Sequence, residues 1–130
     1  MITEPTVFIL GAGASAPYGL PTGEQLRDKI LELSTNDSYQ GLFETCGHDL
    51  SELKKFTEAF RMSGTSSIDA VLEHRSEFLE IGKIAITIIL IGCEDEPKLH
   101  IGDWYRYIFA KLNTTFEEFL QNKLSILTFN

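Results

Sequence analysis

The sequence has few cysteines, no long hydrophobic run and no excess of basic residues. Its only two cysteines, Cys46 and Cys93, lie far apart. They cannot form the closely spaced pairs of a structural zinc site, so we expect no bound metal. The longest apolar run, residues 84–91, is far shorter than the ~18 residues that a membrane span needs. The N-terminus has no basic segment before a long apolar run, as a secretory signal would. These absences predict a cytoplasmic protein that does not enter a membrane.

The charge balance is acidic. The chain has 11 Lys and Arg against 19 Asp and Glu, for a net charge of −8. Direct binding to nucleic acid relies on clustered Lys and Arg, so we expect none. A phosphate-containing ligand is still compatible with this charge, because backbone N–H groups of a glycine loop can bind it. With 43% hydrophobic residues in 130, the chain is long enough for one globular domain, residues 1–130, with a sizeable core.

A glycine loop near the start is the most informative stretch. Val7 to Leu10 is short, wholly apolar and rich in β-branched residues, which is typical of a strand buried on both faces in a parallel sheet. Gly11 and Gly13 follow directly. They can take backbone angles closed to other residues, and they let a phosphate approach the main chain. Residues 11–16 fit the pattern G-x-G-x-x-A of dinucleotide-binding proteins, which by itself is weak evidence.

The residues after the loop argue against an ordinary Rossmann oxidoreductase. Pro17, Gly19 and Pro21 disfavour a helix that begins inside the glycine pattern, so we expect an irregular loop as far as Thr22. The acidic residue that usually follows ~20 positions later, at the end of a second strand, is also missing. Asp37 lies at that distance, but in a polar, turn-like segment.

The rest of the chain predicts helices and one more strand. Polar residues 34–41 should break the first helix, and residues 42–47 are ambiguous. The segment from Phe78 is apolar almost all round, which predicts a deeply buried helix. The second strand should lie parallel to the first, so the fold class is α/β, with few parallel strands and several helices. The expected helices span about 22–34, 49–62, 78–93 and 116–121, with two more beginning after Ser67 and at Asp103, and the second strand spans 124–129.

Three segments resemble the sirtuin superfamily. Gly11 to Ser15 reads G-A-G-x-S, and Gly19 to Pro21 reads G-x-P, as in that family. Thr22 and Gly23 differ from the Asp-Phe-Arg of protein-deacylating sirtuins and are similar to the sirtuin-like domains of bacterial antiphage defence, which hydrolyse NAD. Thr128 to Asn130 resembles the family's T-x-N-x-D segment, and residues 67–72 resemble an S-I-D-x-x-L segment.

The resemblance implies an incomplete Rossmann-like, three-layer sirtuin-type fold that binds NAD as substrate or ligand. It implies that Asn130 acts at the nicotinamide ribose, and that a general-base His and an Asp lie beyond Asn130. We therefore expect an inactive N-terminal fragment of a longer NAD hydrolase. Its partners would be NAD, a second copy in a homo-oligomer, and the C-terminal remainder or a sensor domain. The expected NAD-binding residues are Gly11, Ala12, Gly13, Ala14, Ser15, Pro21, Thr22 and Asp69.

Other readings of these features remain open. One alternative is a nucleotide-sensing or dimerisation module; a protein deacylase is disfavoured by the missing zinc cysteines. Thr22 suits a helix N-cap, with Gln25 completing a capping box, and Asp69 suits the first turn of a helix. Trp104 and its neighbouring tyrosines could stack on bases, but their helical spacing favours core packing.

Overall fold

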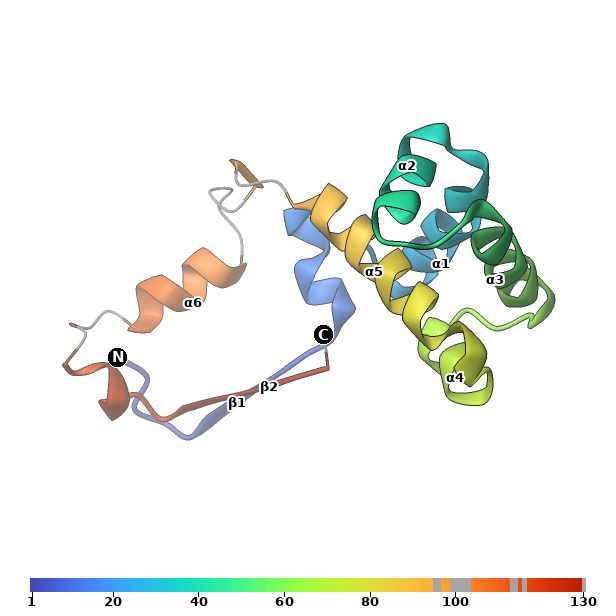
Figure 1. Cartoon of the computed structure of the whole chain (residues 1–130). Helices are drawn as coiled ribbons and strands as arrows, with labels where there is room; N and C mark the ends of the chain where they lie inside the picture. The colour runs from blue at the N-terminus through green and yellow to red at the C-terminus, as the bar shows by residue number, and fades with distance from the viewer. Residues whose placement is uncertain (95–96, 99–103, 113–114, 116, 130) are drawn as a thin grey trace. The chain divides into compact units, whose positions relative to one another are not determined.

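The computed structural model describes residues 1–94, 97–98, 104–112, 115 and 117–129. The chain is a mixed α/β protein that divides into two compact units. Met1–Gly19 and Asp95–Asn130 form the first, called here the strand unit, and Leu20–Glu94 form the second, called the helical unit. Figure 1 shows the strands β1 and β2 of the strand unit and the helices α1 to α5 of the helical unit.

The strand unit contains a two-stranded parallel sheet. β1 spans Thr6–Leu10 and β2 spans Leu124–Thr128, which confirms both expected strands and their parallel pairing. The register pairs Thr6 with Leu124 and Leu10 with Thr128. A backbone hydrogen bond of 2.9 Å from the Thr6 N–H to the Lys123 carbonyl extends the ladder at its start. Segments more than a hundred residues apart are thereby joined side by side (Figure 1).

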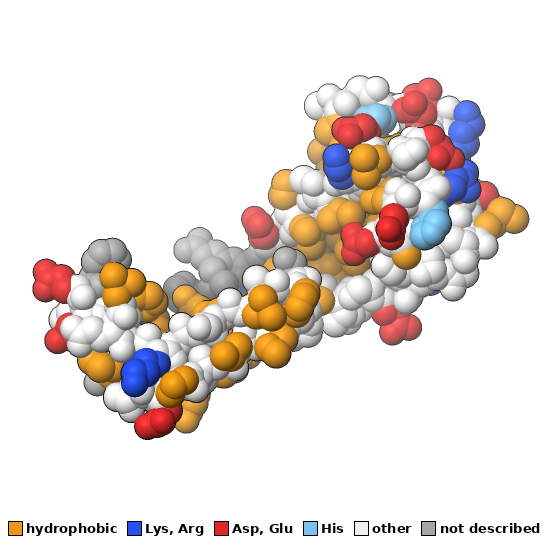
Figure 2. All heavy atoms as spheres, turned by 90° about the horizontal axis from the view of Figure 1, so that it is seen from below, with side chains coloured by type: hydrophobic (Ala, Val, Ile, Leu, Met, Phe, Trp, Pro, Cys, Tyr) orange, Lys and Arg blue, Asp and Glu red, His pale blue; other side chains and the backbone are white. Residues whose placement is uncertain are grey.

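The expectation that β1 is buried on both faces is wrong. Val7 and Ile9 are 63% and 68% exposed, and Leu127 and Phe129 are 49% and 75% exposed. Alternate residues of a strand point to the same face, so the register puts these four side chains on one face of the sheet. Hydrophobic side chains are visible at the surface of the strand unit (Figure 2). These apolar side chains therefore form a sheet face that is not covered by the described residues of the strand unit.

The loop after β1 is helical, not irregular as expected. A 3₁₀ helix, η1, spans Ala12–Tyr18 and includes Pro17. Proline lacks the N–H that would bond the carbonyl three residues earlier, at Ala14. The indole N–H of Trp104 bonds that carbonyl instead, at 3.0 Å. Because Trp104 supplies a donor to the Ala14 carbonyl, this carbonyl is satisfied despite the missing N–H of Pro17. The strand unit also contains α6, Trp104–Leu112, and η5, Phe119–Gln121; the start at Asp103, and residues 113–114 and 116, lie outside the described residues.

The helical unit confirms the expected helices over 22–34, 49–62 and 78–93 and the one after Ser67. Thr22 caps α1 with Gln25 in a capping box, Asp49 caps α3 and Ser67 caps α4. The polar segment ends the first helix as expected, because Asn36 has an extended backbone, but it also begins α2, whose N-cap Asn36 accepts from the Ser38 N–H at 3.0 Å. The elements are α1 Gly23–Glu32, η2 Leu33–Thr35, α2 Asp37–Thr45, α3 Leu50–Met62, α4 Ile68–His74, η3 Ser76–Phe78 and α5 Leu79–Cys93.

The hydrophobic core lies wholly in the helical unit, as far as the described residues show. Its aromatic members Phe43, Phe56 and Phe60 are fully buried, and Phe56 packs against Phe60 with ring centroids 6.3 Å apart. The full set is Ile30, Leu33, Phe43, Leu53, Phe56, Phe60, Ile68, Val71, Leu72, Ile81, Ala85 and Ile89.

The α5 helix is buried on one face, which corrects the expectation of deep burial all round. Ile81, Ala85 and Ile89 are buried, whereas Ile91 is exposed. Gly82 lets α5 approach α4 closely, because a Cβ at this position would lie 2.5 Å from Leu72 Cδ2. No helix among the described residues is long and apolar enough to cross a membrane. The described residues also hold no cluster of three or more metal-ligating side chains.

Candidate nucleotide-binding site

The glycine loop begins at the carboxyl end of β1. Gly11 has an extended backbone, with φ −96° and ψ −180°. Neither Gly11 nor Gly13 has positive φ, and a Cβ at either would meet nothing within 4 Å. The expectation that these glycines use backbone angles closed to other residues is therefore wrong. That geometry occurs at Gly19, with φ 89°, where η1 ends. What Gly11 and Gly13 provide is open space at an exposed main chain.

The loop is held by its own backbone and by α6. The Ala14 N–H donates to the Gly11 carbonyl at 2.9 Å, and the Gly19 N–H donates to Ala16 at 3.0 Å. The Trp104 indole donates to the Ala14 carbonyl, and the Trp104 ring meets the Tyr18 ring edge-on at 6.4 Å between centroids. Trp104 thus positions the loop. A buried or half-buried indole has one N–H that needs an acceptor, and this is the signal by which the sequence could have identified it.

The other aromatic residues of α6 are not core residues. Tyr105 and Tyr107 are exposed, so core packing, the favoured interpretation from their spacing, is wrong for them. Tyr105 meets the Tyr18 and Trp104 rings edge-on. The Lys111 ammonium lies 5.2 Å from the centre of the Tyr107 ring.

Two of the sirtuin-like segments, the one that starts at Gly11 and the one that starts at Thr128, begin at the carboxyl end of the paired strands. Leu10 and Thr128 are paired in the register, and the Phe129 N–H donates to the Leu10 carbonyl at 3.0 Å. The segment before Asn130 therefore lies directly beside the residue before Gly11. Asn130 itself lies outside the described residues. The carboxyl ends of parallel strands are where α/β folds bind ligands.

The remaining candidate residues belong to the helical unit. Pro21 is buried, and the Thr22 N–H donates to Gln25 Oε1 at 2.9 Å in the capping box. Asp69 is exposed in the first turn of α4. The Ser67 hydroxyl oxygen accepts from the Ala70 N–H at 3.3 Å and caps the same helix. The geometry of Thr22 and Asp69 is that of ordinary helix starts.

Residues 11–16 of the loop carry no titratable side chain, so a ligand at this segment would be bound mainly through backbone groups. Ser15, half-buried, carries the only hydroxyl between Gly11 and Ala16. Two carboxyl groups of the helical unit have lowered pKa values. A hydrogen bond from the Arg75 side chain lowers the pKa of Glu77, and one from the Ser51 side chain lowers that of Asp49. A phosphate at the loop would meet N–H groups and one hydroxyl, with no carboxylate on the loop itself to repel it.

Comparisons with known protein families, with curated proteins and with solved structures found no match to this chain.

Proposed function

We propose that the glycine loop of the strand unit binds NAD. One observation carries the proposal: the Phe129 N–H bonds the Leu10 carbonyl, so both sirtuin-like segments lead to the same carboxyl edge of a parallel pair. Gly11 and Gly13 leave the main chain open to a pyrophosphate there. Ser15 supplies a hydroxyl, whereas a role for Pro21, Thr22 and Asp69 in NAD binding rests on the resemblance alone.

The proposed reaction of the domain is NAD hydrolysis, as in the antiphage-defence proteins that the sequence resembles. The bond from the ribose to a cationic nicotinamide is weak, and its cleavage passes through an oxocarbenium-like state. A site therefore has to hold the pyrophosphate, orient the ribose and place a water at the ribose carbon. The loop would do the first, and Asn130 would orient the ribose hydroxyls or the water.

The 130-residue chain should bind NAD without turning it over. The resemblance assigns the general base to a His after Asn130, and losing one such group slows a reaction about 10²–10⁴-fold. Nicotinamide release, measured by liquid chromatography after incubation with NAD, should stay at the level of a sample without protein. Sustained release that is proportional to protein concentration would contradict this assignment of the base.

A binding module that senses nucleotide or dimerises is the second candidate. The observation that favours it is the exposed apolar face of the sheet, formed by Val7, Ile9, Leu127 and Phe129. Large exposed apolar patches mark interaction surfaces. A module that only dimerises differs from the first candidate in one measurement, because it does not require NAD to bind at the loop. A nucleotide sensor would bind NAD and not hydrolyse it.

The test is isothermal titration of NAD into Gly13→Val. A Cβ at Gly13 meets nothing within 4 Å and its φ is not positive, so the variant should fold. Its branched side chain would fill the space that the phosphate needs, and binding should be lost. Gly41→Val is the control, because a Cβ at Gly41 in α2 also meets nothing within 4 Å. Equal NAD affinity in the two variants would overturn the proposal.

A further inference from the structure

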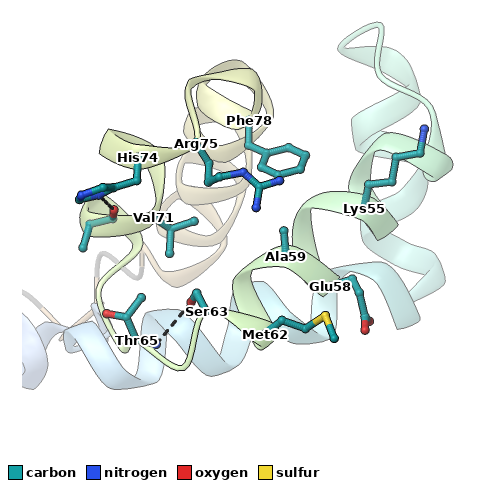
Figure 3. A pocket seen from close by; sticks show the side chains of 11 residues that line it. Lys55, Glu58, Ala59, Met62, Ser63, Thr65, Val71, His74, Arg75 and Phe78 are labelled. Carbon is teal, nitrogen blue, oxygen red and sulfur yellow. Dashed lines mark hydrogen bonds between the residues drawn. The ribbon is translucent and has the colours of Figure 1, made fainter.

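A groove in the helical unit is independent of the glycine loop. Its volume is about 820 Å³, within the range of binding sites for organic ligands. One wall comes from α3 and the other from α4 and η3, as Figure 3 shows. The lining residues are Lys55, Glu58, Ala59, Met62, Ser63, Thr65, Ala70, Val71, His74, Arg75 and Phe78.

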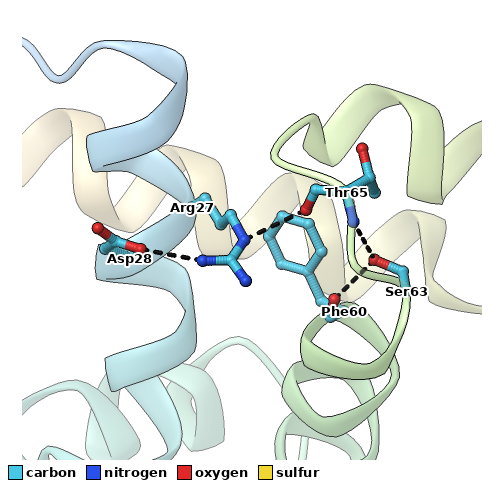
Figure 4. A network of polar contacts seen from close by, with 5 residues as sticks. All are labelled: Arg27, Asp28, Phe60, Ser63 and Thr65. Carbon is cyan, nitrogen blue, oxygen red and sulfur yellow. Dashed lines mark hydrogen bonds and ion pairs between the residues drawn. The ribbon is translucent and has the colours of Figure 1, made fainter.

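A polar network shapes one end of the groove. The Ser63 hydroxyl donates to the Phe60 carbonyl at 2.7 Å, and the Thr65 N–H donates to the Ser63 hydroxyl oxygen at 3.3 Å. Arg27 Nε, on α1, donates to the Thr65 carbonyl at 3.2 Å (Figure 4). Gly64 completes the turn with φ 67°, a conformation that favours glycine. The turn between α3 and α4 is thus fixed to a third helix, and the two walls are held apart.

The groove has an apolar lining between the two walls. Val71 is buried at its base, and Phe78 packs against the core residue Phe56 with ring centroids 5.8 Å apart. Met62 is 80% exposed on the opposite wall. A methionine is flexible and adapts to different apolar surfaces. Because the walls are mostly solvent-exposed, the groove suits a segment of another protein more than an enclosed small molecule.

The charges in the groove are mainly positive. Arg75 Nε bonds Glu77 Oε1 at 2.6 Å, and its guanidinium carbon lies 5.0 Å from the centre of the Phe78 ring. Its two terminal nitrogens donate to no described residue, and they can hold a carboxylate in the bidentate manner. Lys55 forms no ion pair with a described residue. His74 Nδ1 lies 2.8 Å from the Ala70 carbonyl oxygen.

Two acidic residues near these cations, Glu58 and Glu77, are already engaged, and Lys55 also helps to lower the pKa of Asp49. Glu58, the carboxylate among the lining residues, pairs with Arg61 Nη1 at 3.1 Å. Glu77 is held by Arg75. At physiological salt the Debye length is about 8 Å, so a bound segment responds mainly to these nearby charges and less to the net charge of the chain.

We infer that this groove docks an acidic amphipathic helix of a partner protein. Apolar side chains of the partner would lie over Val71, Met62 and Phe78. Its flanking Asp or Glu residues would face Lys55 and the terminal nitrogens of Arg75. This is the helix-in-groove mode of peptide recognition, with charge complementarity selecting the partner.

The test uses fluorescence anisotropy with two labelled peptides. One is a 15-residue helix with leucines on one face and glutamates flanking them, and the other has lysines in place of the glutamates. The acidic peptide should bind more tightly. Lys55→Glu should weaken its binding by about 3–10-fold, since an exposed pair contributes up to ~1 kcal/mol and the reversal adds repulsion. Met62→Ser, at an exposed position, removes an apolar contact without adding charge and should weaken both peptides.

The matched control is Lys54→Glu, which makes the same charge change on the neighbouring residue of α3. Lys54 is exposed and does not line the groove, so its variant should bind the acidic peptide nearly as the wild type does. Equal losses in Lys54→Glu and Lys55→Glu, equal affinity for the two peptides, or no binding of the acidic peptide would each overturn the inference. So would a concentration-dependent dimer that Met62→Ser abolishes, because the occupant would then be a second copy.

Discussion

Replacing Ile9 by lysine should prevent the chain from self-associating. Ile9 is 68% exposed on the sheet face that it shares with Val7, Leu127 and Phe129. Neither β1 nor β2 contains a charged residue. Edge strands normally carry charges, prolines or bulges that prevent pairing with another chain. We therefore propose that two copies associate through this face or through the strand edges beside it.

The exposed fractions of the four side chains set the apolar burial that association can gain. Full burial of such a side chain contributes about 1.5–3 kcal/mol, so burying the exposed parts of four contributes roughly 4–8 kcal/mol per copy. Two copies give roughly 8–16 kcal/mol, against an association cost of about 4–15 kcal/mol. The two ranges overlap, so association through this face should depend on the protein concentration. Ile9→Lys removes about 1–2 kcal/mol from each copy, which raises Kd at least about 30-fold.

Sedimentation velocity over a wide range of concentrations measures this directly. The wild type should shift from monomer to dimer, and Ile9→Lys should stay monomeric. Leu42→Lys, at another exposed apolar position in α2, should behave as the wild type does. A wild type that remains monomeric at millimolar concentration, or a dimer that Ile9→Lys leaves intact, would refute the reasoning.

Gly82→Ala should destabilise the helical unit by up to about 2 kcal/mol, because overpacking against Leu72 costs about 1–3 kcal/mol and the better helix propensity returns about 1. Gly92→Ala, in the same helix but with open space around its Cβ, should instead stabilise the helical unit by up to about 1 kcal/mol. Urea unfolding should therefore show changes in unfolding free energy of opposite sign for the two variants. Equal changes would disprove the tight contact at Gly82. Trp104→Phe removes the hydrogen bond to Ala14, so NAD titration should show affinity about 2–10-fold weaker. Unchanged NAD affinity in Trp104→Phe would show that this bond does not position the loop.

Local signals in the sequence were sufficient for most helices. Asp49 and Ser67 are N-cap residues placed before apolar stripes of period 3.6, and both cap helices in the structure. The parallel pairing of 124–128 with the first strand also followed from two short apolar runs. The α2 helix was missed because it buries only Phe43, too little for a visible stripe.

The errors concern burial and long-range contacts, which periodicity does not encode. The sequence of an apolar strand is the same whether its face is covered or exposed. The exposure of Val7 and Ile9 could therefore not be predicted from the apolar pattern of the strand. The helical loop after Gly11 depends on Trp104, about ninety residues away, which supplies the donor that Pro17 lacks. The glycine pattern located the candidate site. It did not show that Gly19 is the position where the loop needs positive φ.

Calorimetric titration of NAD into the wild-type chain and Gly13→Val tests the central claim most directly. Heat of saturable binding in the wild type, lost in Gly13→Val and retained in Gly41→Val at unchanged thermal stability, is the result that we predict. Identical titration curves for the wild type and Gly13→Val, or no binding heat in any of the three proteins, would contradict the assignment of the glycine loop as an NAD site.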